Sequence, residues 1–330
     1  MKRRWRVGLG VAAAVAAAVA AVGSAVGGGR PGSSFATTAW TTVLRSTLPI
    51  EGLTGDDGGN LYVAARGGAA ACPVYRVEAN GPANQTPVVV GSVAPPCSPS
   101  GLTFGPDGRL YLTGAGAAGD AIAVLSPNAG APPVATIFAT GTPATLQPPL
   151  APAPQNIVAN GLAFTPDGAL LVADTARGAL WRVELDQDGS VLSPVGCDTT
   201  FTADTLCFED VFVQHPLLDG ADGIALDRAG NVWVDANERN AIAIVDREGR
   251  VSELFRNPVG AGNLRNGGPL EFPTSPFLAD RTLCTTSSDG NRRDNSPNSA
   301  GEVGPGTGFA GKISCADERL QVPGLPLPVG

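Results

Sequence analysis

Short apolar runs, each bounded by polar or glycine-containing turns, recur along the chain from residue 51 onward. Four stretches share one pattern, in which a polar residue and a glycine precede an apolar run, a turn and a second apolar run: residues 51–63, 100–112, 160–172 and 222–234. The turns contain Pro-Asp-Gly twice and Ala-Gly-Asn once, and such turns are typical of β-hairpins. Each stretch therefore predicts two antiparallel strands joined by a tight turn.

The spacing of these stretches indicates the fold class. Their glycines stand at positions 52, 101, 161 and 223, so each unit has room for about four strands. Repeats of this length with several strands are typical of a β-propeller. Residues 271–286 read as a degenerate fifth repeat, and a sixth blade would combine residues 36–45 with residues 308–315. The sequence thus predicts an all-β, six-bladed propeller of four-stranded antiparallel blades, closed by strands from both chain ends. Seven blades remain an alternative.

The N-terminus differs from the rest of the chain. A basic segment at residues 2–6 precedes an alanine-rich apolar segment, and small residues lead up to position 25. This pattern predicts a signal peptide over residues 1–25, a flexible linker over 26–34 and a single propeller domain over 35–330. We therefore expect a secreted or extracytoplasmic protein. The alternative is an uncleaved membrane anchor, because residues 7–26 carry no charge.

The composition of the chain limits the classes of partner that the protein is expected to bind. Hydrophobic residues make up 43% of the chain, which suffices for a sizeable core, and only 5% are aromatic, so aliphatic side chains must fill most of it. The formal net charge is −8 at pH 7, and no basic cluster follows the N-terminal segment. An acidic protein of this kind is a poor nucleic-acid binder. A small-molecule substrate or ligand and a cation suit it better.

The six cysteines all follow the N-terminal segment. An even number in an exported chain predicts structural disulfides, although six cysteines permit fifteen pairings. Pairing of neighbours along the chain is the simplest arrangement: Cys72 with Cys97, Cys197 with Cys207, and Cys284 with Cys315. No Cys-x-x-Cys motif is present, which argues against a zinc or redox site.

Three of the polar residues that open the repeats form a candidate metal site. They are Glu51, Asn160 and Asp222. The innermost strand of each blade lines the central channel, so equivalent starting positions should surround one mouth of it. Two carboxylates and an amide oxygen suit Ca²⁺, Mg²⁺ or Mn²⁺, whereas zinc more often takes histidine or cysteine. The alternative is that Glu-Gly, Asn-Gly and Asp-Gly are simply turn-prone pairs.

These repeat starts, with "NGLAF" at 160–164 and "DGIALD" followed by "GNVWV" at 222–234, resemble the gluconolactonase/regucalcin (senescence marker protein) family. The resemblance implies a six-bladed propeller with one divalent cation at the channel mouth, Ca²⁺ before Mg²⁺, Mn²⁺ or Zn²⁺. It also implies that Asp222 both binds the cation and acts as general base. The expected function is that of a secreted, metal-dependent hydrolase of a lactone or small ester.

The second repeat departs from that family. It opens with Pro99-Ser100 where gluconolactonases have an Asn-Asp pair, and their sugar-binding arginine has no counterpart upstream. We expect Ser100, Arg66 and Asp174 to line the substrate pocket. The single histidine, His215, precludes a two-histidine catalytic pair and suits a loop or packing role. The alternative function is a non-catalytic propeller that binds a ligand or protein, with a structural cation or none.

Overall fold

The computed structural model describes residues 40–66, 70–95, 97–105, 108–115, 122–125, 159–175, 177–184, 211–256, 272–280, 282–288, 311–317 and 324. Residues 31–330 form one compact unit. The predicted signal peptide and linker fall outside the described residues. The described residues form five antiparallel β-sheets and two short 3-10 helices, η3 (Pro216–Leu218) and η4 (Asn237–Arg239). No helix within these ranges is long and apolar enough to cross a membrane.

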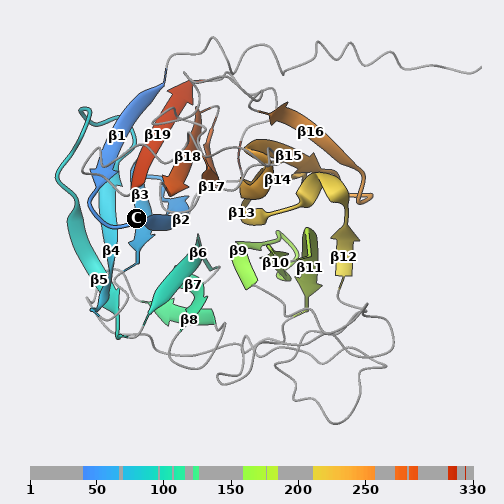
Figure 1. Cartoon of the computed structure of the whole chain (residues 1–330), viewed down its shortest axis with the longest axis horizontal. Coiled ribbons are helices and arrows are strands. Elements are labelled where there is room, and N and C mark those ends of the chain that lie inside the picture. Colours follow the sequence, from blue (N-terminus) through green and yellow to red (C-terminus); the bar gives the residue numbers. More distant parts are fainter. Residues whose placement is uncertain are drawn as a thin grey trace, which may run out of the picture. The chain divides into compact units, whose positions relative to one another are not determined.

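Each predicted repeat opens one sheet, and all four predicted hairpins are confirmed (Figure 1). The first sheet contains β2 (Ile50–Gly55), β3 (Asn60–Ala65), β4 (Cys72–Glu78) and β5 (Val88–Val93). The second is three-stranded, with β6 (Ser98–Phe104), β7 (Leu110–Ala115) and β8 (Ile122–Leu125). The third contains β9 (Ala159–Phe164), β10 (Leu170–Asp174), β11 (Ala179–Val183) and β12 (Val211–Gln214). The fourth contains β13 (Ala221–Leu226), β14 (Val232–Ala236), β15 (Ala241–Val245) and β16 (Val251–Arg256).

The fifth sheet joins the two ends of the propeller chain. It contains, in spatial order, β1 (Thr41–Ser46), β19 (Gly311–Asp317), β18 (Thr282–Ser288) and β17 (Pro273–Ala279). The antiparallel pairing of β1 with β19 confirms closure by strands from both ends. The assignment of residues 271–286 and of the two ends to separate fifth and sixth blades was wrong, because β18 pairs with β19 along seven residues. The described residues therefore form five blades, and a count of six is not confirmed.

The innermost strands approach one another closely around the channel. In the order β2, β6, β9, β13 and β17, each contacts the next, and β17 contacts β2 (Figure 1). A Cβ atom on Gly101 would lie 2.3 Å from the backbone oxygen of Asn160, and one on Gly161 would lie 2.4 Å from that of Asp222. The glycines that open the repeats are therefore required by this close backbone approach.

Aliphatic residues fill the spaces between neighbouring sheets, as the composition predicts. One cluster lies between the closing sheet and the first sheet and includes Val43, Leu44, Ile50, Leu53 and Ile313. A second cluster lies between the third and fourth sheets and includes Leu171, Leu180, Ile224 and Val234. These alternating inward positions bury the apolar face of each blade.

Two of the three predicted disulfides are confirmed. Cys72 in β4 is bonded to Cys97, and Cys284 in β18 is bonded to its cross-strand partner Cys315 in β19. The predicted 197–207 pair lies outside the described residues. Disulfides are typical of proteins from oxidising compartments.

Candidate metal and active site at the channel mouth

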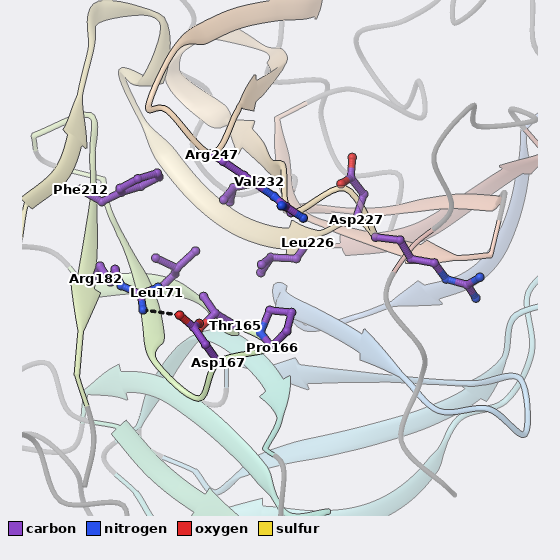
Figure 2. Close-up of a pocket in the computed structure, with 12 residues that line it drawn as sticks. Thr165, Pro166, Asp167, Leu171, Arg182, Phe212, Leu226, Asp227, Val232 and Arg247 are labelled. Atoms are coloured by element: carbon purple, nitrogen blue, oxygen red, sulfur yellow. Dashed lines mark hydrogen bonds and ion pairs between the residues drawn. The ribbon is translucent and has the colours of Figure 1, made fainter.

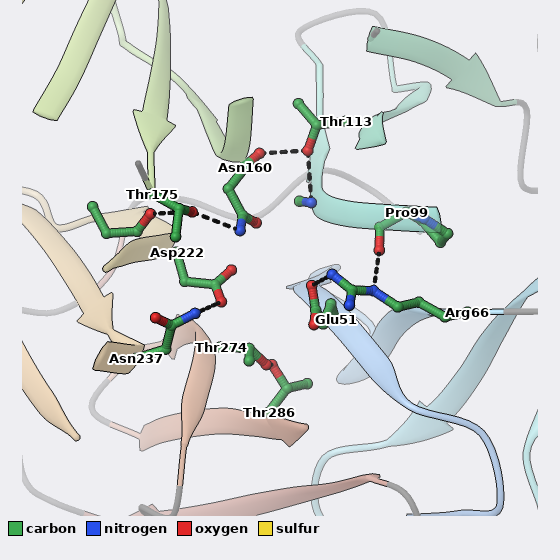
Figure 3. Close-up of polar contacts among 12 residues, drawn as sticks. Glu51, Arg66, Pro99, Thr113, Asn160, Thr175, Asp222, Asn237, Thr274 and Thr286 are labelled. Atoms are coloured by element: carbon green, nitrogen blue, oxygen red, sulfur yellow. Dashed lines mark hydrogen bonds and ion pairs between the residues drawn. The ribbon is translucent and has the colours of Figure 1, made fainter. Parts of the chain in front are cut away.

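The residues that open the repeats sit at irregularities in the strand pairing. Between the first and second strands of each repeat the register shifts, and the shifts fall between residues 51 and 53, 99 and 102, 159 and 162, and 221 and 224. A bulge of this kind breaks the in–out alternation of side chains and re-aims one of them. Figure 3 shows the side chains of Glu51, Asn160 and Asp222 extending from three different blades toward one space.

Glu51 in β2 is buried and forms an ion pair with Arg66. The Arg66 guanidinium lies 2.5 Å from the Glu51 carboxylate, and its Nε also donates to the backbone oxygen of Pro99 at 3.4 Å. Burial raises the pKa of Glu51 to about 7, against the opposing effect of the Arg66 charge. The side chain of Arg66 is 37% exposed, so the guanidinium that pairs with the buried Glu51 reaches solvent.

Asn160 in β9 is held through its amide nitrogen. Its Nδ2 donates to the hydroxyl of Thr175 at 3.0 Å, and that hydroxyl donates to the backbone oxygen of Ala221 in the next blade at 2.8 Å. The Oδ1 atom of Asn160 is buried and has no hydrogen-bond partner in the described part of the chain. The amide is thus oriented with its acceptor oxygen available.

Asp222 in β13 is almost completely buried, with an exposed fraction of 1%. The Nδ2 of Asn237 donates to its Oδ2 at 2.6 Å, while its Oδ1 has no partner among the described residues. Burial and the charge of Glu51 raise the pKa of Asp222 well above its usual range, although the hydrogen bond from Asn237 opposes the change. The influence of Glu51 means that carboxyl groups from two blades share one electrostatic environment.

One sequence spacing links these pairs. Arg66, Thr175 and Asn237 each stand 15 residues after the polar residue that they contact. Each therefore follows the second strand of its repeat and returns to the mouth beside the start of the first. Thr175 and Asn237 were not among the predicted site residues, and this constant spacing is the sequence signal that could have found them.

Asp174, a predicted pocket residue, lies one position before Thr175 and has different partners. Its side chain is fully buried, accepts a hydrogen bond from Trp181 Nε1 at 3.2 Å and lies 3.8 Å from Arg177 Nε. Successive side chains along a strand point in opposite directions, so a difference of one residue places Thr175 rather than Asp174 against Asn160.

The second repeat contributes neutral groups. Ser100 is buried in β6, and the nearby Thr113 hydroxyl accepts from Gly101 N at 2.7 Å and donates to the backbone oxygen of Asn160. The single histidine is away from these contacts: His215 Nδ1 accepts from Leu217 N and caps η3. This confirms the predicted loop role of His215.

A further buried acid lies behind Asp222. Asp235 in β14 accepts a hydrogen bond from the Thr285 hydroxyl of the closing sheet at 2.8 Å, and its Oδ1 has no partner within the described ranges. Burial raises the pKa of Asp235 to about 8, and its charge contributes to the raised pKa of Asp222. Asp235 was not among the predicted site residues.

The profile of the family described as SMP-30/Gluconolactonase/LRE-like region matches residues 36–262, which is more than half of the chain. The chain belongs to this family. A comparison with curated protein sequences finds no match.

Solved structures share the fold of this SMP-30/gluconolactonase/LRE-like protein at low sequence identity. A calcium-binding protein, regucalcin, from Agrobacterium tumefaciens has a TM-score of 0.50 and 17% identity, with 88% of this chain and 98% of that chain covered. A luciferin-regenerating enzyme also has a TM-score of 0.50, with 14% identity and coverage of 88% and 99%. Both establish similarity of fold.

The mouth of this SMP-30/gluconolactonase/LRE-like protein fits a hard divalent cation by its chemistry. Buried oxygen atoms of Asn160, Asp222 and Asn237 have no hydrogen-bond partner in the described residues, and leaving such acceptors unpaired is costly. No three His, Cys, Asp or Glu side chains in those ranges are grouped as a metal cluster. Any cation here would therefore need amide oxygens and water beside the two carboxylates, as Ca²⁺ accepts.

Proposed function

We propose that this protein is a metal-dependent hydrolase of a lactone or another small ester, with its site at the channel mouth. Glu51, Asn160 and Asp222 would hold the cation. The observation that carries the proposal is the group of buried oxygens there without hydrogen-bond partners, beside carboxyl groups whose pKa values are raised. Perturbed acids in a polar recess are a signature of functional sites.

Ca²⁺ is the proposed cation, ahead of Mg²⁺, Mn²⁺ and Zn²⁺. The donor set contains only oxygen, which favours hard cations, and the similar Agrobacterium protein is described as calcium-binding. The described cysteines are disulfide-bonded and the lone histidine caps η3, so none of these side chains supplies a zinc ligand at the mouth. Export, proposed from the N-terminal segment and supported by the disulfides, would place the protein where Ca²⁺ is abundant.

The residues of the chain have separate tasks in this proposal. A bound divalent cation polarises a carbonyl group and acidifies water. Asp222 accepts the proton of the attacking water as the new carbon–oxygen bond forms, and returns a proton to the leaving alkoxide when the ester bond breaks. Asn237 holds the Asp222 carboxylate in place through its hydrogen bond. Arg66 and Ser100 would contact the small-molecule substrate at the rim.

A second candidate function is ligand binding without catalysis. The observation that favours it is the ion pair between Arg66 and Glu51, which occupies one carboxylate of the proposed cation site. Ser100 also supplies a neutral group where a charged one would strengthen cation binding. In this alternative the mouth recognises a small polar ligand, and a cation is structural or not required.

Calorimetry of the purified protein, treated with chelator, tests the proposal. We expect Ca²⁺ to bind with a stoichiometry of one, and Asp222→Ala to abolish binding. Because the pKa values of Glu51 and Asp222 are raised, binding should also release protons, which buffers of different ionisation enthalpy would detect. Asp219→Ala is the matched control, because it removes an exposed carboxylate three residues away.

A lactone panel assayed in parallel separates the two candidate functions. Hydrolysis that requires the cation and is lost in Asp222→Ala supports the hydrolase. Cation binding without turnover on any lactone or small ester favours the binding protein. If none of Ca²⁺, Mg²⁺, Mn²⁺ and Zn²⁺ binds, the proposed site is wrong.

A further inference from the structure

A second recess lies at the opposite end of β13, between the third and fourth sheets (Figure 2). It has a volume of about 480 Å³, within the range that holds small organic molecules. Its apolar lining comes from five side chains: Pro166, Leu171, Phe212, Leu226 and Val232. Asp222 is near the start of β13 and this recess is near its end, so the two sites are about 16 Å apart along the strand.

The charged residues around this inter-blade recess are predominantly basic. Three arginines and two aspartates line it, which leaves a net charge of +1. Asp167 is paired with Arg182 at 2.9 Å. The carboxylate of Asp227 accepts four hydrogen bonds within its own hairpin. Among the described residues, neither aspartate forms an ion pair with Arg228 or Arg247.

Arg228 and Arg247 both line the recess without an acidic partner among the described residues. Arg228 Nε donates to the backbone oxygen of Gly324 at 3.0 Å, which leaves Arg247 as the lining arginine without a hydrogen-bond partner in that part of the chain. The sequence neighbours of Arg247, Asp246 and Glu248, are both paired with Arg250, at 2.6 and 3.1 Å. The side chain of Arg247 instead lies against Gly230, where a Cβ atom would stand 2.4 Å from its Nε. Glycine at position 230 thus leaves room for the guanidinium beside the recess, and Figure 2 shows Arg247 next to Val232 there.

We propose that this recess is a binding site for a small organic carboxylate with an apolar body. The carboxylate would pair with the Arg247 guanidinium, whose planar arrangement of donors matches that group. The apolar body would cover Leu171, Phe212 and Leu226. The net charge of +1 matches a monoanion, and the apolar lining disfavours a fully hydrated inorganic ion.

Calorimetric titration with 4-phenylbutyrate tests the proposal on the full chain. We expect saturable binding of one molecule, in the millimolar range or tighter for a ligand of this size. Arg247→Gln should weaken binding roughly tenfold, because a charge-assisted hydrogen bond is lost. Arg239→Gln is the matched control: it removes the same charge from the same blade at a residue that does not line the recess, and it should change the affinity less than twofold.

Two ligand controls keep the chemistry defined. The neutral 4-phenylbutan-1-ol lacks the charge and acetate lacks the apolar body, so each should bind at least tenfold more weakly than 4-phenylbutyrate. Absence of saturable binding would overturn the proposal. Equal affinity of wild type and Arg247→Gln, or of the carboxylate and the alcohol, would overturn it as well. Cation binding at the channel mouth should be unchanged in Arg247→Gln.

Discussion

Two aspartates at the two ends of β13 are equally buried and have opposite surroundings. Asp227, at the hairpin end, is 1% exposed and accepts hydrogen bonds from Ala229 N, Asn231 N, Asn231 Nδ2 and Trp233 Nε1. Asp222, at the channel mouth, is also 1% exposed but accepts one hydrogen bond, from Asn237. Both are followed by turn-forming residues in the sequence, and both could be read as turn residues.

These two aspartates show how a carboxylate with a structural role differs from one that is a candidate for binding or catalysis. At the hairpin end both carboxylate oxygens of Asp227 accept hydrogen bonds that stabilise the turn. Asp56 has the same role in the first blade, where it accepts hydrogen bonds from Asn60 and Tyr62. At the mouth, the cost of burial is left uncompensated by the described residues, which is reflected in the raised pKa of Asp222. Such a cost is expected where a ligand supplies the missing interaction.

The largest effect on stability is expected for glycine substitutions, which differ between the inner end of a blade and its hairpin end. Gly161→Ala should lower the free energy of unfolding by about 4 kcal/mol or prevent folding, because the new Cβ would lie 2.4 Å from the Asp222 backbone oxygen. Gly168→Ala, in a hairpin turn with φ +91 and open space around it, should lose only about 1 kcal/mol of stability. Urea denaturation measures both, and equal losses would contradict the close approach of the inner strands.

Asp227→Ala should lower the free energy of unfolding by about 3 kcal/mol, since it leaves the buried donors of Asn231 and Trp233 unpaired. Asp222→Asn, its counterpart at the mouth, should change stability by less than about 1 kcal/mol, because the amide can still accept from Asn237. The expected order is reversed for cation affinity: Asp222→Asn should weaken cation binding, and Asp227→Ala should leave it nearly unchanged. If Asp227→Ala also abolished cation binding while folded, the two ends would not be functionally distinct.

The pH dependence of stability should come from the mouth. The pKa of Glu51 is raised from 4.5 to about 7 and that of Asp235 from 3.8 to about 8, so the folded state binds more protons than the unfolded state across these intervals. The free energy of unfolding should therefore fall as pH rises from 5 to 8 in chelator, by about 6 kcal/mol for the two groups together. Asp235→Asn should flatten this decline. An unchanged slope in that variant would show that Asp235 does not titrate as described.

The smallest effect is expected from Arg66. Arg66→Gln should tighten Ca²⁺ binding about threefold to tenfold, because the guanidinium 2.5 Å from Glu51 opposes a second positive charge. Arg239→Gln is the matched control, since Arg239 forms a similar ion pair with Glu253 at 2.8 Å. Weaker Ca²⁺ binding in Arg66→Gln alone would mean that Arg66 supports the cation site instead of competing with it.

Much of the fold could be predicted because its cause is local and repeated. Alternating apolar residues and turn chemistry determine each hairpin, and the same polar-Gly start identifies four inner strands. The blade count was not predictable in this way. Ser275, against which a Cβ on Gly223 would clash, stands where the other repeats have glycine, so the fifth inner strand lacks the common signature. Its sheet is completed by long-range pairing of β18 with β19 and of β19 with β1.

Repeat pattern and turn chemistry identify which side chains open the repeats, and hence that Glu51, Asn160 and Asp222 occupy equivalent positions. The partners and charge states of these side chains depend on contacts between segments that are distant in the chain. The second strand of each blade folds back along the first and brings the partners into contact: Arg66, Thr175 and Asn237. The raised pKa of Asp222 depends on burial and on Glu51 from another blade. The physical reason is that apolar alternation and turn chemistry depend on residues that are neighbours in the chain, whereas desolvation and electrostatic interaction depend on everything that surrounds a group in space.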